Sequence, residues 1–205
     1  MLDLTANFTP EQTEIWNKAL ELAKACAFDQ VHSYQVTRLA LRIFDDLLEL
    51  LQLSSQERFW LQLAGLLHDI GWIEGWKGHH KTSLNIILTT PLLPFDQRER
   101  LLIGSVCRYH RRALPDLSHD HFAALDDPDR RTVARLAAIL RVADGLDCTH
   151  RSLVIDLTAQ FDSSTIQLDC QADSPALDEE RDALKKGGLL ESVFYRKLVI
   201  HWIVV

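Results

Sequence analysis

The chain has 205 residues, of which 47% are hydrophobic and 25% charged, and a net charge of −7. This length supports one substantial core with a small extension, and the acidic charge argues against non-specific nucleic-acid binding. No apolar run is long enough to cross a bilayer, no signal peptide is visible at the start, and four scattered cysteines without CxxC spacing favour neither a disulfide framework nor a zinc knuckle. We therefore expect a cytoplasmic protein with no membrane or nucleic-acid partner, and we leave a homodimer open as its oligomeric state.

Two amphipathic helices are predicted near the N-terminus. Thr9 and Gln12 have the spacing of a capping box that opens the first, and apolar residues then recur at helical intervals. The second is predicted from about residue 29 to residue 53, with His32 in its first turn. A single histidine at such a place is more often a surface or capping residue, so a role for His32 as a ligand depends on the rest of the chain.

The stretch LAGLLHDIG, residues 63–71, ends a third predicted helix that opens with the capping box SSQE. His68 and Asp69 follow its apolar stripe and are predicted in its last turn. Polar groups at the edge of a core cost free energy unless they have a partner. A divalent metal can bind an imidazole nitrogen and a carboxylate oxygen together, so this pair indicates metal ligation.

The loop WIEGWKGHHKTS follows, and SLNIILTT continues as a helix up to Pro91. His79 and His80 stand at the junction of this loop and helix. Adjacent histidines in a loop that contains glycine are surface residues about as often as ligands, so both readings stay open. The next helix is predicted to be capped by Asp96 and to run up to His110.

A polar loop or short turn over residues 112–127 contains a second His-Asp pair, His119-Asp120, whose loop context separates it from the first. Asp127 is predicted to cap a long helix that Pro128 starts. Asp144 falls on the apolar stripe of this helix. A buried acid needs a partner, and we expect either a metal or, as the alternative, an ion pair with a neighbouring arginine.

After about residue 152 the pattern changes from helical spacing to alternation. SLVIDLTAQF and STIQLDCQA are typical of two strands, a helix is predicted from about residue 176 to residue 193, and KLVIHWIVV is typical of a final strand. We predict a mainly α fold. It comprises a helical domain over residues 1–151 and a small α+β extension over residues 152–205, made of two strands, a helix and a strand.

The candidate polar residues stand at helix ends or helix junctions. Helices that pack antiparallel could bring such ends to one place. The candidate residues together therefore indicate a common site more strongly than any one of them does. Basic residues concentrate in CRYHRR (residues 107–112) and again between residues 130 and 151. In an acidic protein this concentration is compatible with a pocket for a small phosphate compound and, for any one of these residues, about equally with a solvated arginine on a helix face.

His32, HDIG (residues 68–71) and VADGLD (residues 142–147) resemble the H…HD…D signature of the HD-domain metal-dependent phosphohydrolase superfamily. GHHKTS, RYHRR, RVADGLDCTHR and FYRKLVI are similar to the C-terminal part of the exopolyphosphatase and guanosine pentaphosphate phosphatase family. The resemblance implies an all-helical HD core with Asp69 as the bridge where two metals bind. The implied ligands of the first metal are His32, His68, Asp69 and Asp144, and those of a second are His79 or His80, with His110.

Three departures from these families restrict what the resemblance implies. Thr82 stands where the family often has a histidine, so the choice between His79 and His80 stays open. Trp72 replaces the lysine that follows HDIG in cyclic-dinucleotide phosphodiesterases, and their GYP segment has no counterpart, which disfavours that activity. The family's actin-like ATPase-type domain has no counterpart in the sequence, so polyphosphate chemistry is not carried over.

We expect a metal-dependent phosphohydrolase, a phosphatase or phosphodiesterase, whose substrate is a nucleotide or another small phosphate ester. One or two divalent ions would lower the pKa of a bound water to about 7, and the mixed ligands favour Fe, Mn, Co, Ni or Zn, with Mg also compatible. His68 and Asp69 are the predicted catalytic residues, and Lys81, Arg111 and Arg112 are the predicted phosphate contacts. The alternative is a non-catalytic regulatory or ligand-binding module.

Overall fold

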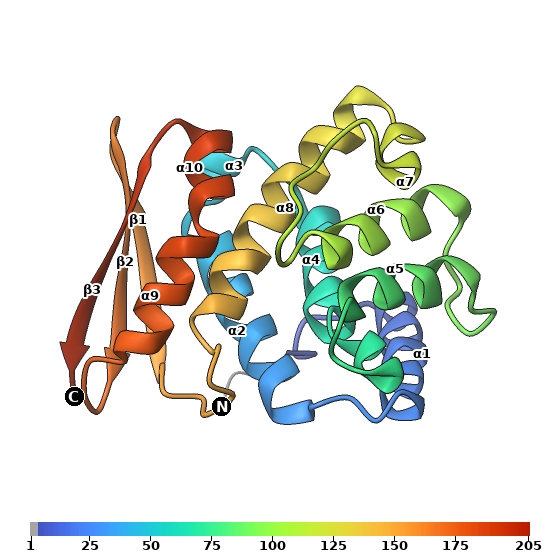
Figure 1. Ribbon diagram of the computed structural model, residues 1–205, viewed down its shortest axis with the longest axis horizontal. Coiled ribbons are helices and arrows are strands. Elements are labelled where there is room, and N and C mark those ends of the chain that lie inside the picture. The colour runs from blue at the N-terminus through green and yellow to red at the C-terminus, as the bar shows by residue number, and fades with distance from the viewer. Residues whose placement is uncertain (1–3) are drawn as a thin grey trace.

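The computed structural model describes residues 4–205, so the first three residues of the predicted helical domain lie outside the described residues. The helical part comprises α1 (Pro10–Ala25), α2 (Gln30–Asp46), α3 (Leu48–Leu51), α4 (Ser55–Leu67), the 3₁₀ helix η1 (Ile70–Glu74), α5 (His79–Thr89), α6 (Gln97–Arg108), α7 (Asp120–Ala123) and α8 (Asp127–Gly145). The rest comprises β1 (Asp156–Phe161), β2 (Thr165–Ala172), α9 (Leu177–Lys186), α10 (Gly188–Phe194) and β3 (Lys197–Val204). The predicted mainly α fold with a small α+β appendage is confirmed (Figure 1).

The three predicted capping boxes are present. In each, the first side chain accepts a hydrogen bond from a backbone N–H of the first turn, and the side chain three residues later accepts one from the capping residue. The pairs are Thr9 with Gln12, Ser54 with Glu57, and Asp96 with Glu99. Each cap satisfies backbone donors that the helix leaves free and contributes about 1 kcal/mol.

Helix boundaries differ from the prediction in several places. The helix predicted over residues 29–53 is interrupted at Leu47, and α3 follows. The helix predicted over residues 176–193 is two helices, α9 and α10, which meet at Gly187. Asp126, one residue before the predicted Asp127, caps α8 by accepting the N–H of Asp129.

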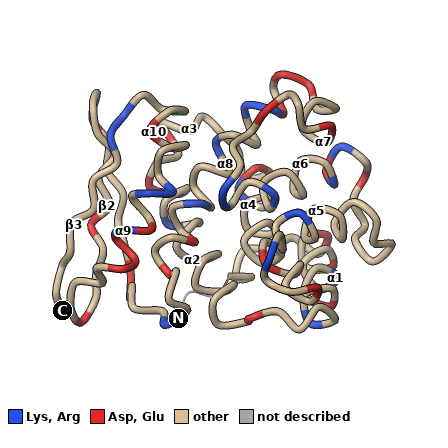
Figure 2. The backbone as a smooth tube through the Cα atoms, viewed as in Figure 1, with Lys and Arg blue, Asp and Glu red and all other residues tan. Residues whose placement is uncertain are grey.

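Helices α2, α4, α6 and α8 pack against one another around the main core. The inward-facing residues belong to the apolar stripes that the sequence predicted. Among them are six fully buried residues, Leu39, Ile43, Leu63, Leu66, Val106 and Leu140. None of the described helices combines the length and the apolar character that a membrane span requires. Acidic and basic residues both occur throughout the fold (Figure 2).

The sheet has the order β1-β2-β3, with β1 and β2 antiparallel and β2 and β3 parallel. The connection between the parallel strands is formed by α9 and α10, which lie between the sheet and α8 (Figure 1). The C-terminal segment therefore folds back onto α8, the helix that carries Asp144. The boundary between two domains at residue 151 stays a prediction.

Candidate metal centre

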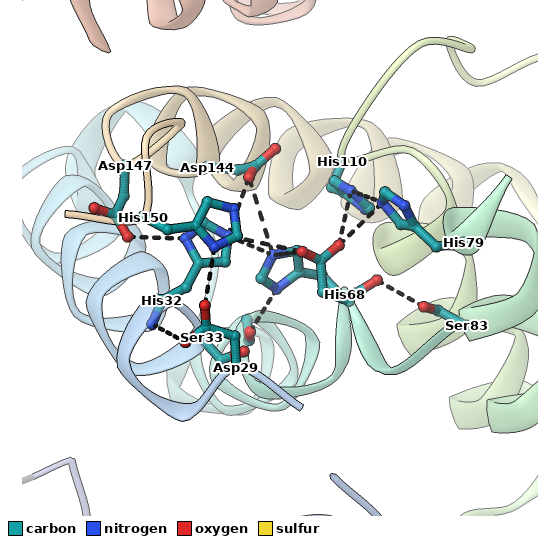
Figure 3. A network of polar contacts seen from close by, with 12 residues as sticks. Asp29, His32, Ser33, His68, His79, Ser83, His110, Asp144, Asp147 and His150 are labelled. Atoms are coloured by element: carbon teal, nitrogen blue, oxygen red, sulfur yellow. Dashed lines mark hydrogen bonds and ion pairs between the residues drawn. The ribbon is translucent and has the colours of Figure 1, made fainter. Parts of the chain in front are cut away.

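Side chains from several helix ends meet at one place in the helical part (Figure 3). One lies in the first turn of α2, one in the first turn of α5 and one in the last turn of α8, while the others follow α4 and α6 directly. These residues are His32, His68, Asp69, His79, His110 and Asp144, and each is at most 8% exposed. The structure thus brings together six residues that the sequence singled out.

The first group surrounds a point between α2, α4 and α8. The Nε2 atoms of His32 and His68 lie 3.3 Å apart, and Asp144 Oδ1 lies 3.5 Å and 4.0 Å from them respectively. Asp69 Oδ2 lies 3.8 Å from His32 Nε2 and 3.5 Å from His68 Nε2. Ligand atoms that are each about 2.1 Å from one ion lie roughly 3.0 to 3.5 Å apart. The spacing of these four atoms is close to that of a coordination shell.

The second group contains the other oxygen of Asp69. Asp69 Oδ1 lies 3.1 Å from His79 Nε2 and 3.4 Å from His110 Nε2, and these two nitrogens are 3.3 Å apart. Burial raises the pKa of Asp69, but its electrostatic interactions with His68 and His110 outweigh burial and lower the pKa below its usual value. The carboxylate is therefore ionised and faces a pair of histidines with each oxygen.

Three of the histidines share one arrangement, in which Nδ1 faces the backbone carbonyl three residues earlier. The pairs are His68 with Gly65 (2.8 Å), His79 with Trp76 (2.8 Å) and His110 with Cys107 (2.7 Å). A carbonyl oxygen can only accept, so each Nδ1 carries the proton. In the neutral ring, Nε2 then presents a lone pair toward the centre.

His32 is oriented by Asp147, whose Oδ2 lies 2.8 Å from Nδ1 of His32. The other oxygen of Asp147 accepts the N–H of Ser152 at 2.7 Å, so the carboxylate is itself held in place. Burial lowers the pKa of His32, but the hydrogen bonds of Asp144 and Asp147 outweigh it and raise the pKa to about 10. A carboxylate behind a histidine is the arrangement that orients imidazole ligands at metal sites.

The residues present fit a divalent cation. In the second group the lone pairs of His79 and His110 face each other at 3.3 Å, and burial lowers the pKa of His110 well below its usual value. The buried Oδ1 of Asp69 has no hydrogen-bond partner among residues 4–205. A cation between these three atoms would satisfy them together, and imidazole nitrogen with carboxylate oxygen is a donor set that such ions bind.

The close approach of η1 to α5 positions His79. A Cβ on Gly71 would overlap the backbone carbonyl of His79, so only glycine fits there. Ser83 on α5 donates to the carbonyl of His68 at 2.7 Å and accepts the N–H of Gly71 at 2.9 Å. The turn that follows α4 is thereby joined to α5.

Asp144 has a partner that the sequence analysis did not predict. The alternative to metal ligation was an ion pair with an arginine, whereas the structure pairs Asp144 Oδ2 with Lys186 Nζ at 2.6 Å. Burial raises the pKa of Asp144, but Lys186 and His32 hold it well below its usual value. Lys186 ends α9, so no local pattern around Asp144 could indicate it.

Four predicted site residues contribute no atom to either group: His80, Lys81, Arg111 and Arg112. His80 was predicted in a loop but is the second residue of α5; it is buried, its Nδ1 has no partner among the described residues, and burial lowers its pKa to about 4. Lys81 and Arg112 are exposed. Of the predicted phosphate contacts, Arg111 is the one that reaches the cavity described below.

His150 was missed by the sequence analysis as a site residue. Its ring stacks on that of His32 with centroids 3.7 Å apart, and its Nδ1 lies 3.0 Å from Asp29 Oδ2. One ring nitrogen of His150 could join His32 and Asp69 in holding a cation. His150 and Asp147 follow Asp144 within six residues, in the stretch VADGLDCTH, but a loop has no periodicity that would show where they point.

A cavity of about 540 Å³ opens next to the two groups. Asp69, His110 and Asp144 form part of its lining. Trp72, Trp76 and Arg111 also line it, together with Arg181 and Lys186 of α9. A small molecule in this cavity would contact both the polar groups and the C-terminal segment.

The chain matches the model of a known protein family. The family model described as Ppx/GppA phosphatase, domain III matches residues 17–188. The matched range begins within α1 and ends at the start of α10, so it contains all residues of both groups and also Lys186. No curated protein matches the chain.

Proposed function

The chain belongs to the family of Ppx/GppA phosphatase domain III, and from this premise we propose that it is a metal-dependent phosphohydrolase with an HD-type metal centre. The observation that carries the proposal is Asp69, whose two oxygens each face a separate pair of histidines. One carboxylate shared by two sets of nitrogen ligands is the arrangement expected of a bridging ligand.

Two ions have residues to hold them. His32, His68, Asp144 and Oδ2 of Asp69 would hold the first, and Oδ1 of Asp69 with His79 and His110 would hold the second. The mixed imidazole and carboxylate ligands favour Fe, Mn, Co, Ni or Zn, and Mg is also compatible. Such ions, when bound, lower the pKa of water and stabilise charge on a phosphoryl group.

The protein's own groups hold protons and orient the reactants. Asp69 is ionised at neutral pH, so it can accept a hydrogen bond from the attacking water. His68 keeps its proton on Nδ1 through Gly65, which leaves Nε2 directed at the centre. Arg111 forms no ion pair with a carboxylate among the described residues, so its charge is available to phosphate oxygens.

The cavity favours a nucleotide over an aliphatic phosphate ester. Its volume lies in the range of small-molecule sites. Trp72 and Trp76 are 45% and 58% exposed, and the ring of Trp72 lies 5.3 Å from that of His79. Stacking of a base on an aromatic ring is worth about 1–3 kcal/mol. One cavity would therefore accommodate a phosphate at the metal centre and a base stacked on a tryptophan.

The second candidate is a regulatory or ligand-binding module without turnover. The ion pair between Lys186 and Asp144 favours it, because the protein thereby supplies a positive charge to one of the predicted metal ligands. Such a module would keep the cavity and its affinity for a phosphorylated ligand, and would release no phosphate.

Metal analysis combined with a substrate panel tests the proposal. The protein is reconstituted with Mn²⁺, Fe²⁺ or Co²⁺ and assayed against nucleoside mono-, di- and triphosphates, cyclic nucleotides and a simple aryl phosphate. We expect bound metal and phosphate release that EDTA abolishes. Metal binding without turnover on any of these would support the regulatory module instead, and a protein that binds none of the metals would contradict the proposal.

A further inference from the structure

The C-terminal segment reaches the metal centre through the last residue of α9. Lys186 Nζ lies 2.6 Å from Asp144 Oδ2 and 2.7 Å from Asp182 Oδ2. Its side chain is 16% exposed, so the ammonium group is largely removed from water. A residue outside the predicted helical domain thus contacts a residue of the first group directly.

Packing of α9 on α8 determines where Lys186 lies. A Cβ on Gly145 would come within 2.5 Å of Ala183 Cα, so the two helix backbones are in contact at this point. Arg141 of α8 donates to the carbonyl of Lys186 at 3.2 Å and to that of Tyr109 at 2.9 Å. The backbone of Lys186 is therefore held by the same helix that carries Asp144.

Lys186 occupies one oxygen of Asp144 and leaves the other free for the centre. Asp144 Oδ1 is the atom that faces Nε2 of His32, at 3.5 Å, while Oδ2 is turned toward Nζ. We propose that Lys186 is a positioning residue: it holds Oδ2 so that Asp144 presents Oδ1 alone as a metal ligand. This inference rests on the proposed function, because it assumes that the first group binds a cation.

An ammonium group beside a cation site would oppose binding if its charge stood alone. Asp182 is in contact with the same nitrogen, so Lys186 and Asp182 together are close to neutral. The effect of Lys186 on the centre is therefore directional. Without it, the buried Oδ2 would lack a hydrogen bond, and the carboxylate would rotate or turn both oxygens toward the ion.

Titration with Co²⁺ tests the inference, because the visible absorption of Co²⁺ reports its ligand geometry independently of turnover. In the full chain, we expect Lys186→Met to weaken Co²⁺ binding to the first group by about 10- to 100-fold and to change the absorption spectrum, while the second group keeps its affinity. Lys186→Arg should retain most of the wild-type affinity for Co²⁺. The matched control is Lys185→Met, which removes an exposed neighbouring lysine and should leave affinity and spectrum unchanged.

Thermal unfolding in EDTA shows whether the variants fold. If Lys186→Met does not fold, Asp182→Asn is the second variant. It leaves the positive charge of Lys186 beside Asp144 without the balancing charge of Asp182, and it should weaken Co²⁺ binding by a smaller factor. A folded Lys186→Met protein with the wild-type affinity and spectrum would overturn this inference and leave the proposed function standing. An Asp182→Asn protein with unchanged affinity would do the same. A wild-type protein that binds no Co²⁺ would overturn the inference together with the proposed function.

Discussion

The chain contains the dipeptide His-Asp twice, and its two copies lie in different surroundings. His68 and Asp69 follow α4 and are buried, with the imidazoles of three other helix ends around them. His119 caps the short helix α7, its Nδ1 lies 2.8 Å from the hydroxyl of Tyr109, and Asp120 is exposed. The same two side chains are thus part of a candidate site in one region and of a surface turn in the other.

The two His-Asp pairs differ in which side chains and how much solvent surround them. At His68-Asp69 water is excluded, so each polar atom must find a partner within the protein or a bound ion. At Asp120 solvent supplies the partner, and no other acid or imidazole is required. A dipeptide therefore becomes a candidate metal site through the helix ends that converge on it.

The largest effect is expected from Asp69→Ala. Asp69 contributes an oxygen to each group, so its removal should abolish metal binding at both and reduce phosphate release on the order of a thousandfold or more. Metal analysis and the substrate assay measure this. Asp120→Ala is the matched control and should behave as the wild type. Retention of both metals by Asp69→Ala would contradict the bridging role.

Asp147→Asn should have the next largest effect. The change removes the charge that orients His32 while leaving the size of the side chain nearly the same. We expect metal affinity at the first group to fall about 10- to 100-fold, because such supporting carboxylates set ligand orientation and basicity. Equilibrium dialysis with Mn²⁺ measures the change. Asp116→Asn, in the loop near the second pair, should leave affinity unaltered.

Gly71→Ala should lower both stability and metal binding at the second group. The added methyl would overlap the carbonyl of His79 and push α5 away from the turn after α4. Overpacking of this kind costs about 1–3 kcal/mol, which urea unfolding would detect. Gly188→Ala is the control, because nothing lies within 4 Å of its added carbon. Equal stability of the two variants would argue against the close approach as a requirement.

The smallest expected effect is on the pH dependence of protein stability, and it comes from His121, next to the second His-Asp pair. Burial lowers the pKa of His121 to about 4, below the unfolded value of about 6.5, so the folded protein binds fewer protons than the unfolded chain between these values. His121 therefore opposes folding as the pH falls from 6.5 to 4, by on the order of 1–2 kcal/mol after allowance for its partial exposure. Urea unfolding at pH 7 and pH 4.5 should show a smaller loss for His121→Asn than for the wild type. The same loss in both proteins would exclude His121 as the cause.

Much of the fold follows from local patterns. The capping boxes, the apolar stripes and the change to alternation near residue 152 each depend on neighbouring residues, and each predicted an element that the structure contains. Asp144 was recognised by the same reasoning, because an acid on an apolar stripe stands out within a single helix. Helix boundaries were less certain, since a break such as that at Leu47 depends on what the next turn packs against.

Local sequence patterns could not decide whether His79 or His80 faces Asp69. Both lie in the first turn of α5, and successive residues of a helix point roughly 100° apart, so only one can face Asp69. The sequence predicted a loop here, in which either ring could turn inward. The approach of Gly71 to α5 decided that His79 lies near Asp69 Oδ1.

Consecutive residues alone identified the helices and the polar residues on or beside their apolar stripes, namely His68, Asp69 and Asp144, because apolar periodicity and capping are local properties. Which candidate residues meet, and which groups support them, depends on how distant helices pack. Asp147 lies 115 positions from the His32 that it orients, and Lys186 lies 42 positions from Asp144. Such contacts arise from the packing of whole helices, and no pattern within one segment records which distant helix end will arrive beside it.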